Sequence, residues 1–130
     1  MSQVSFTNII AWQKAHAFVL EVYRCCAKFP DYEKFGLFSQ FTRAAVSVPA
    51  NIAEGYKRLS QNEKLRFLNY SQSSIEECRY YIILCKDLGY FDSDEYNKIN
   101  NLIEETSKLL NGYVKGVMNF SAEKANVLTP

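Results

Sequence analysis

Glycine, proline and histidine are scarce in this chain of 130 residues, which contains five, three and one of them. Bundles that bind haem or a carboxylate-bridged metal pair need axial histidines or Glu-x-x-His pairs. The single histidine, His16, follows neither acidic pair, Glu76-Glu77 or Glu104-Glu105. We therefore expect no metal and no cofactor, and we interpret His16 as a surface or boundary residue.

Long uncharged apolar runs are also absent, and no segment of about 18 such residues is available to span a membrane. The first residues, MSQVSFTNII, lack the basic and apolar regions of a secretory signal, so we expect a cytoplasmic protein. Neither a glycine-rich phosphate loop nor a G-x-S-x-G motif occurs. These absences indicate no small-molecule substrate and predict that the protein is not an enzyme.

The four cysteines, Cys25, Cys26, Cys78 and Cys85, form no C-x-x-C pair. Neighbouring Cys25 and Cys26 would point about 100° apart on a helix. We predict reduced, buried thiols that serve as small apolar residues. A Cys–His nucleophile pair would require His16 to meet a thiol on another helix, which the sequence does not suggest.

Charge of one sign is not in large excess, because the formal net charge is +1. Obligatory nucleic-acid binders normally carry a strong basic excess, so this value argues against that class. The charge is uneven, with nine Lys or Arg against five Asp or Glu in residues 1–66, and six against nine in residues 67–130. The chain thus has a mildly basic half and a mildly acidic half.

What the chain does contain is apolar residues at alternating spacings of three and four, which predict helices. The expected helices cover about residues 8–29, 32–58, 61–88 and 93–120, and residues 121–130 have no period and are predicted to be a flexible tail. Short connections between long helices favour antiparallel neighbours. The prediction is one all-α domain, residues 1–120, folded as an up-down-up-down four-helix bundle.

The second helix contains Pro49 in its interior, yet its apolar phase continues from Val48 to Ile52 and Leu59 without a change. A helix that stopped at Val48 would have no reason to keep this register. We therefore predict one long helix that bends near Pro49. Ser71 and Ser74 on the third helix are small enough to let a neighbouring helix approach closely.

One face of the second helix carries a line of polar residues with helical spacing: Gln40, Arg43, Ser47, Asn51, Glu54 and Arg58. In the structural interpretation Glu54 pairs with Arg58, and Ser47 or Asn51 helps to satisfy the carbonyl that Pro49 leaves without a donor. In the functional interpretation Arg43 and Arg58 face phosphates or acidic groups of a partner. We favour a network between helices or subunits.

A basic cluster, Lys57, Arg58, Lys64 and Arg66, surrounds the turn between the second and third helices, close to Tyr56 and Tyr70. Basic residues interleaved with aromatic rings can bind single-stranded nucleic acid. The alternative is a set of solvated helix ends. Together with Arg43, this cluster makes up the candidate residues for binding nucleic acid or another partner.

Nine tyrosines and nine phenylalanines exceed what one thin bundle core requires. Such an excess indicates rings that become buried between subunits. The first helix carries two apolar lines, and further apolar residues flank the apolar stripe of the third helix. Both patterns also indicate apolar surface that is buried between subunits. We expect a homo-oligomer.

The segment FTNIIAWQKAHAF and the later segment FPDYEKFGLFSQFTRAAVSVPANIAEGYKRLSQNEKLRFLNYSQSSIEECRYYIILCKDLGYF resemble the four-helix bundle family named for the 23S ribosomal RNA intervening sequence protein. The likeness covers about residues 6–91, and its most specific part pairs Trp12–Ala15 with Arg43–Gly55. The resemblance implies a helical bundle whose relatives assemble as closed homopentameric rings. Members are often encoded within insertions of bacterial 23S ribosomal RNA genes, and their biochemical role is generally unassigned.

The resemblance extends distantly to the accessory protein of diversity-generating retroelements, which works with a reverse transcriptase and nucleic acid. That relative is strongly basic, whereas this chain is near neutral. Our leading hypothesis is a non-enzymatic, self-associating bundle, a pentamer by resemblance, that serves as a scaffold or adaptor for a protein or ribonucleoprotein. The alternative is a nucleic-acid-binding module that uses Arg43 and the basic cluster.

Overall fold

Four long helices and two short 3-10 turns account for the regular structure in a computed structural model that describes the backbone of residues 5–128 and the side chains of residues 5–120. Along the chain these are η1 (Phe6–Asn8), α1 (Ile10–Cys26), η2 (Asp31–Glu33), α2 (Leu37–Lys57), α3 (Gln61–Asp87) and α4 (Ser93–Leu128). Residues 5–128 contain no strand. The predicted all-α class is confirmed.

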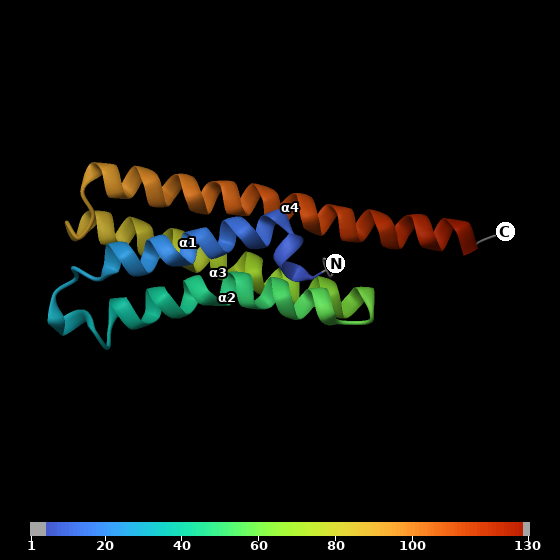
Figure 1. The fold of residues 1–130 in the computed structure, drawn as a ribbon, viewed down its shortest axis with the longest axis horizontal. Coiled ribbons are helices and arrows are strands. Elements are labelled where there is room, and N and C mark those ends of the chain that lie inside the picture. The colour runs from blue at the N-terminus through green and yellow to red at the C-terminus, as the bar shows by residue number, and fades with distance from the viewer. Residues whose placement is uncertain (1–4, 129–130) are drawn as a thin grey trace.

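Consecutive helices run antiparallel and pack side by side (Figure 1). α1 packs against α2 and α4, and α3 packs against the same two helices. α1 and α3 therefore occupy diagonal positions across the bundle. The predicted up-down-up-down four-helix bundle is confirmed, and α2 continues through Pro49 as a single helix.

The first two helices are shorter than expected because the chain around Pro30 is not α-helical. α1 ends at Cys26, before the expected end at residue 29, since the residue before a proline is disfavoured in the helical region. α2 begins at Leu37, later than the expected residue 32, because η2 and then Gly36 (φ −111°, ψ −112°) interrupt the helix.

The third helix, Gln61–Asp87, agrees with the expected range of about residues 61–88. The Ser60 hydroxyl accepts a hydrogen bond from the Glu63 amide (3.1 Å), and Gly89 has a φ of +77°, a conformation that favours glycine. The Glu63 carboxylate accepts two hydrogen bonds from Arg66.

The predicted tail at residues 121–130 is wrong through Leu128, because α4 continues to that residue. The segment SAEKANVL contains neither glycine nor proline, so nothing in it terminates a helix. α4 projects beyond the ends of the other helices (Figure 1). Residues 129–130 lie outside the part of the chain that the structure describes.

The core is built from the predicted apolar stripes, with Phe18, Phe41, Ile52 and Ile82 fully buried. Phe41 lies 6.4 Å from Phe18 between ring centroids, which joins α1 to α2 at the centre of the bundle. Leu59 was expected in the stripe of the second helix but is 100% exposed, because α2 ends at Lys57. Within residues 5–128, none of the helices has the length and hydropathy of a membrane span.

Candidate functional site

Part of the polar line on α2 contacts α3. The Tyr81 hydroxyl donates to Gln40 Oε1 (3.1 Å), and the Ser47 hydroxyl hydrogen-bonds the Ser74 hydroxyl. Ser71 is fully buried and donates to the Val48 carbonyl oxygen (2.8 Å). The small side chains of Ser71 and Ser74 thus permit a close approach of the two helices and also fix their register.

The expected partner for the carbonyl freed by Pro49 is not found among these contacts. Pro49 has no N–H, so the Ala45 carbonyl lacks its usual donor. Ser47 Oγ donates to the carbonyl of Ala44 (2.9 Å), and Asn51 Nδ2 donates to the carbonyl of Ser47 (2.8 Å). These side chains therefore support the turns on either side of the proline and do not replace the missing bond.

Arg58 belongs to a stack of cations and rings at the α2–α3 end of the bundle. Its guanidinium donates to Glu54 (3.1 Å) and lies 4.4 Å from the centroid of the Phe67 ring. Arg66 lies over the same ring at 4.9 Å and donates to the Tyr70 hydroxyl (3.0 Å). The predicted pairing of Glu54 with Arg58 is confirmed.

Lys64 is also used inside the chain. Its ammonium donates to the carbonyl oxygens of Tyr56 (2.7 Å) and Gly55 (3.4 Å), the last turn of α2, where a cation is favoured by the helix dipole. Gly55 is itself part of this contact, because a Cβ at its position would lie 3.2 Å from the Lys64 carbonyl oxygen. Lys64 therefore ties the end of α2 to the start of α3.

Two of the candidate cations remain exposed without such partners. Arg43 and Lys57 make no hydrogen bond or ion pair with any side chain in residues 5–120. Arg43 shares a shallow hollow of about 320 Å³ with Glu77 and Tyr81, between α2 and α3. The structure therefore separates the candidate site residues into a packed group, Arg58, Lys64 and Arg66, and an outward-facing pair, Arg43 and Lys57.

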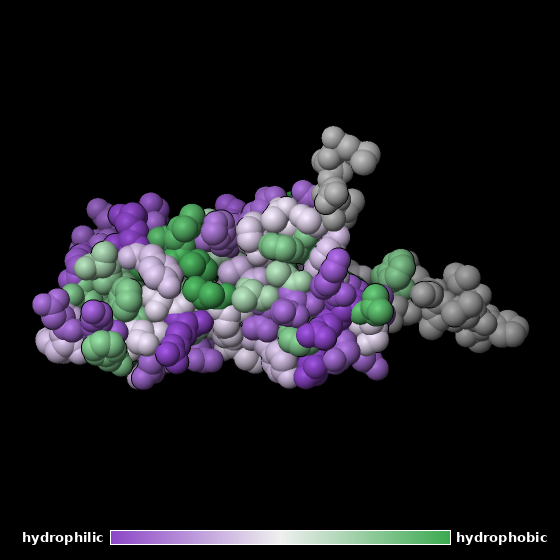
Figure 2. All heavy atoms as spheres, turned by 60° about the horizontal axis from the view of Figure 1, so that its bottom comes forward, coloured by the Kyte–Doolittle hydropathy of each residue, from purple (hydrophilic) through white to green (hydrophobic). Residues whose placement is uncertain are grey.

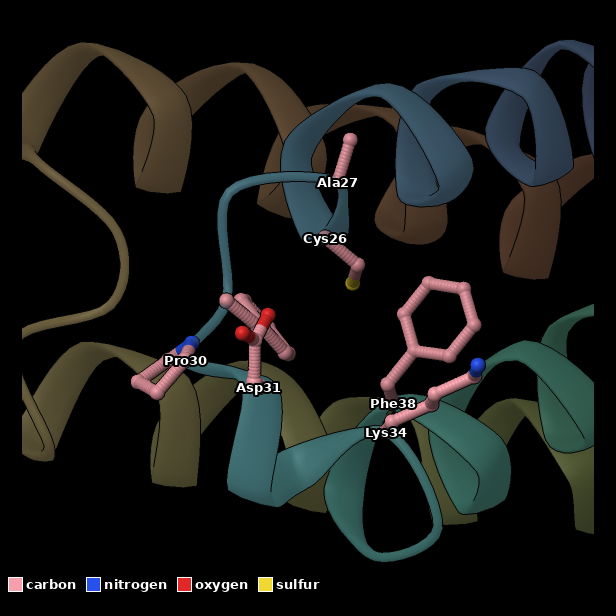
Figure 3. Close-up of a pocket in the computed structure, with 7 residues that line it drawn as sticks. Cys26, Ala27, Pro30, Asp31, Lys34 and Phe38 are labelled. Carbon is pink, nitrogen blue, oxygen red and sulfur yellow. The ribbon is translucent and has the colours of Figure 1, made fainter.

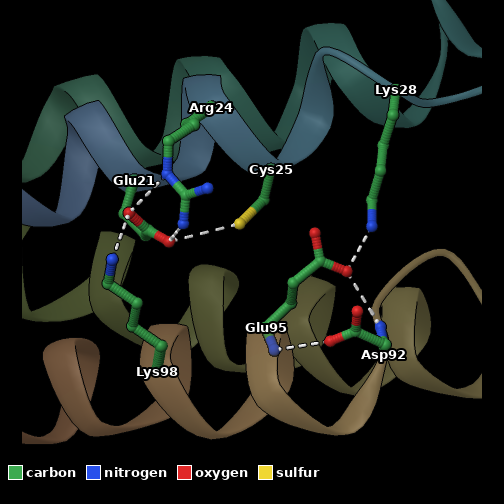
Figure 4. Close-up of polar contacts among 7 residues, drawn as sticks. All are labelled: Glu21, Arg24, Cys25, Lys28, Asp92, Glu95 and Lys98. Carbon is green, nitrogen blue, oxygen red and sulfur yellow. Dashed lines mark hydrogen bonds and ion pairs between the residues drawn. The ribbon is translucent and has the colours of Figure 1, made fainter.

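A second polar cluster, which the sequence did not single out, joins α1 to α4 (Figure 4). Glu21 is buried and accepts hydrogen bonds from Arg24 and from the Cys25 thiol (3.4 Å), while Lys98 lies 3.4 Å away on α4. The Arg24 guanidinium holds the pKa of the Glu21 carboxyl below its usual value. The Glu-x-x-Arg spacing on α1 was the available signal, although it does not reveal the partner on α4.

The same end of the bundle is fastened by a cap at the start of α4. The Glu95 amide donates to Asp92 Oδ1 (2.8 Å), and the Asp92 amide donates to Glu95 Oε1 (3.0 Å), which is a reciprocal capping box. Lys28, two residues beyond the end of α1, pairs with the same Glu95 carboxylate (Figure 4). This cluster joins the end of α1 to the start of α4.

The four thiols are buried and unpaired, as predicted. Burial raises the pKa of Cys25 to about 11 and that of Cys85 to about 12, and it raises the pKa of Cys26 and Cys78 further. Thiols of this kind stay protonated at neutral pH and are poor nucleophiles. His16 is exposed and stacks on Trp12, with 5.1 Å between ring centroids.

Cys26 also faces a hollow of about 230 Å³ at the end of α1 (Figure 3). Phe29, Pro30 and Phe38 supply apolar walls, and Asp31 and Lys34 lie at its edge. Residues 5–120 bring together no group of three side chains that could hold a metal ion. Burial keeps the pKa of the Cys26 thiol at this hollow well above its ordinary value.

Comparison with known proteins assigns the chain to a family. The sequence model of the 23S rRNA-intervening sequence protein matches residues 7–112. The chain belongs to this family. A search of curated proteins finds no match.

A solved structure supports the same assignment. It is a protein of unknown function from the S23 ribosomal protein family of Bacteroides thetaiotaomicron, with a TM-score of 0.73 and 25% sequence identity. The likeness covers 82% of this chain and 99% of that one. The match to the 23S rRNA-intervening sequence protein family ends within α4, so the last part of that helix lies outside it.

Proposed function

We propose that the protein is a non-enzymatic scaffold or adaptor that acts as a homo-oligomer. The observation that carries this proposal is the apolar surface that the bundle leaves exposed. Leu20 and Tyr23 on α1, Val46 on α2, and Tyr80 and Ile83 on α3 all present large side chains to solvent. A chain whose core is already filled has no internal use for these residues, and large apolar patches commonly mark interaction sites.

The chemistry of the side chains supports a role in binding. The thiols have raised pKa values, and the titratable clusters are consumed by ion pairs between helices, as in the Glu21 cluster. Four unpaired buried cysteines also fit a reducing compartment such as the cytoplasm. The family resemblance of the sequence implies a homopentameric ring, which gives the expected subunit number.

Light scattering during size-exclusion chromatography at low micromolar concentration tests this proposal. A mass that is a multiple of the 15.0 kDa chain, with a pentamer as the expected value, supports it. A monomer under these conditions would contradict it.

A nucleic-acid-binding module is the second candidate, and the exposure of Arg43 and Lys57 favours it. The family description names a 23S rRNA intervening sequence, so a structured RNA hairpin is a suitable probe alongside single-stranded RNA. Fluorescence anisotropy at low salt is expected to show binding that weakens with salt. Lys57→Glu should reduce the affinity more than Lys108→Glu, which makes the same charge change on an exposed site of α4. Equal effects of the two variants would count against a site at Lys57.

A further inference from the structure

The first of two exposed apolar surfaces lies where α1 and α2 meet. We call it the α1–α2 face and define it by Leu20, Tyr23, Arg43, Val46 and Ala50. A hollow of about 420 Å³ runs along it, bounded by Tyr23, Val46 and Ala50 with Arg43 at its rim. Figure 2 shows the side that carries α2, with apolar surface gathered near the middle and polar surface around it. This face is concave, apolar and edged by a cation without a partner in residues 5–120.

The second surface is convex and lies on α3. We call it the α3 ridge and define it by Glu76, Glu77, Tyr80, Ile83 and Asp87. Four of these residues follow one another at spacings of four, three and four, which places them on one stripe of the helix. Tyr80 is 58% exposed and Ile83 is 52% exposed, and the carboxylates lie on either side of them. Glu77 and Asp87 have no ion pair among the described side chains.

The two surfaces complement each other in charge and in apolar character. Within one chain they border each other at the hollow that Arg43 and Glu77 line, but their apolar side chains on α1 and α3 lie apart. α1 and α3 occupy diagonal positions and do not pack against each other. The ridge offers an aromatic ring and carboxylates, and the face offers an apolar hollow and the free guanidinium of Arg43. Tyrosine and arginine are among the residue types that are enriched at the centres of protein interfaces.

We propose that the α3 ridge of one copy docks into the α1–α2 face of a second copy. This inference rests on the self-association proposed above and assigns it to two named surfaces. Because the surfaces differ, the contact is head-to-tail, and each copy uses its ridge toward one neighbour and its face toward another. Contacts of this type form closed rings when the rotation closes and open filaments when it does not.

Two variants that each block one surface test the proposal. Leu20→Glu puts a carboxylate opposite the carboxylates of the ridge, and Tyr80→Arg puts a cation opposite Arg43. Each variant alone should have the mass of a monomer, because every contact needs one intact face and one intact ridge. A mixture of the two should form a one-to-one heterodimer and nothing larger, because the intact ridge of the Leu20→Glu chain fits the intact face of the Tyr80→Arg chain.

Native mass spectrometry of the separate and mixed variants gives the readout, with Leu59→Glu as the matched control. Leu59 is fully exposed and lies outside both surfaces, so this control should assemble like the wild type. Circular dichroism checks the fold of each variant. If one fails to fold, Val46→Glu replaces Leu20→Glu on the α1–α2 face, and Ile83→Arg replaces Tyr80→Arg on the α3 ridge. If the wild type is an oligomer and the single variants still assemble, the two-surface contact is overturned. The same holds if the mixed variants stay monomeric. In both cases the proposed self-association still stands. A monomeric wild type would instead overturn the proposed function.

Discussion

Replacing Pro49 by alanine tests whether α2 passes through the proline as one helix. Pro49 lies in the interior of Leu37–Lys57 and is buried. In a helix interior, proline is less favourable than alanine by about 3 kcal/mol, partly because it has no N–H. In the Pro49→Ala variant the amide of residue 49 can donate to the Ala45 carbonyl.

The substitution also removes buried hydrocarbon, and the two effects have opposite signs. Alanine lacks about two of the buried methylene groups of proline, and each contributes about 0.8 kcal/mol. A small cavity and incomplete relaxation of the backbone around it reduce the gain further. The expected net result is a stabilisation of about 1 kcal/mol, which corresponds to a rise of about 3 °C in Tm for a domain of this size.

Urea unfolding followed by circular dichroism at equilibrium measures this difference. Pro30→Ala is the control, because Pro30 precedes η2 with a φ of −55°, outside any α-helix. That change should destabilise the protein by about 0.5 kcal/mol, because alanine increases the conformational entropy of the unfolded chain. A Pro49→Ala variant that is less stable than the wild type by more than about 1 kcal/mol would show no gain in helix propensity from alanine at this position. That result would refute the reasoning.

Three further predictions concern the contacts between helices. Gly55→Ala should destabilise the protein by about 1 kcal/mol, since its Cβ would lie 3.2 Å from the Lys64 carbonyl oxygen, whereas Gly112→Ala, with no atom within 4 Å, should stabilise it by about 0.5–1 kcal/mol. Equal effects in urea unfolding would contradict the close approach of α2 and α3. Arg24 lowers the pKa of Glu21, so ionised Glu21 stabilises the fold above its ordinary pKa of 4.5, and this contribution is lost as the pH falls through the lowered value. The free energy of unfolding of Glu21→Gln should therefore be about 1–2 kcal/mol below wild type at pH 7 and equal to it in strong acid, and a difference independent of pH would refute this assignment. Cys25, whose pKa is raised to about 11, should react with a thiol reagent at pH 8 only after denaturation, and rapid labelling of the native protein would contradict its burial.

The continuity of α2 could be predicted because helical phase is a local property that depends only on sequence spacing. Val48 and Ile52 keep one register across Pro49, and both are fully buried. The small residues Ser71 and Ser74 likewise predicted a close approach, and the structure places them against Val48 and Ser47. These predictions needed no knowledge of which helices are neighbours.

The partners of charged side chains could not be predicted in the same way, because long side chains reach residues that only the tertiary fold brings near. Arg58 and Arg66 were both candidates for a partner, and both stack on Phe67. Glu21 meets Lys98, which is distant in sequence. The end of α4 was predicted wrongly because loss of apolar period was taken as loss of helix, although the segment contains no residue that breaks one.

The central claim is that the bundle functions as an assembly of identical chains. Sedimentation velocity over a dilution series of the wild-type protein tests it most directly, since it reports mass and equilibrium together. The account predicts one oligomeric species at low micromolar concentration that dissociates on dilution toward the 15.0 kDa monomer. A single 15.0 kDa species at every concentration would contradict it.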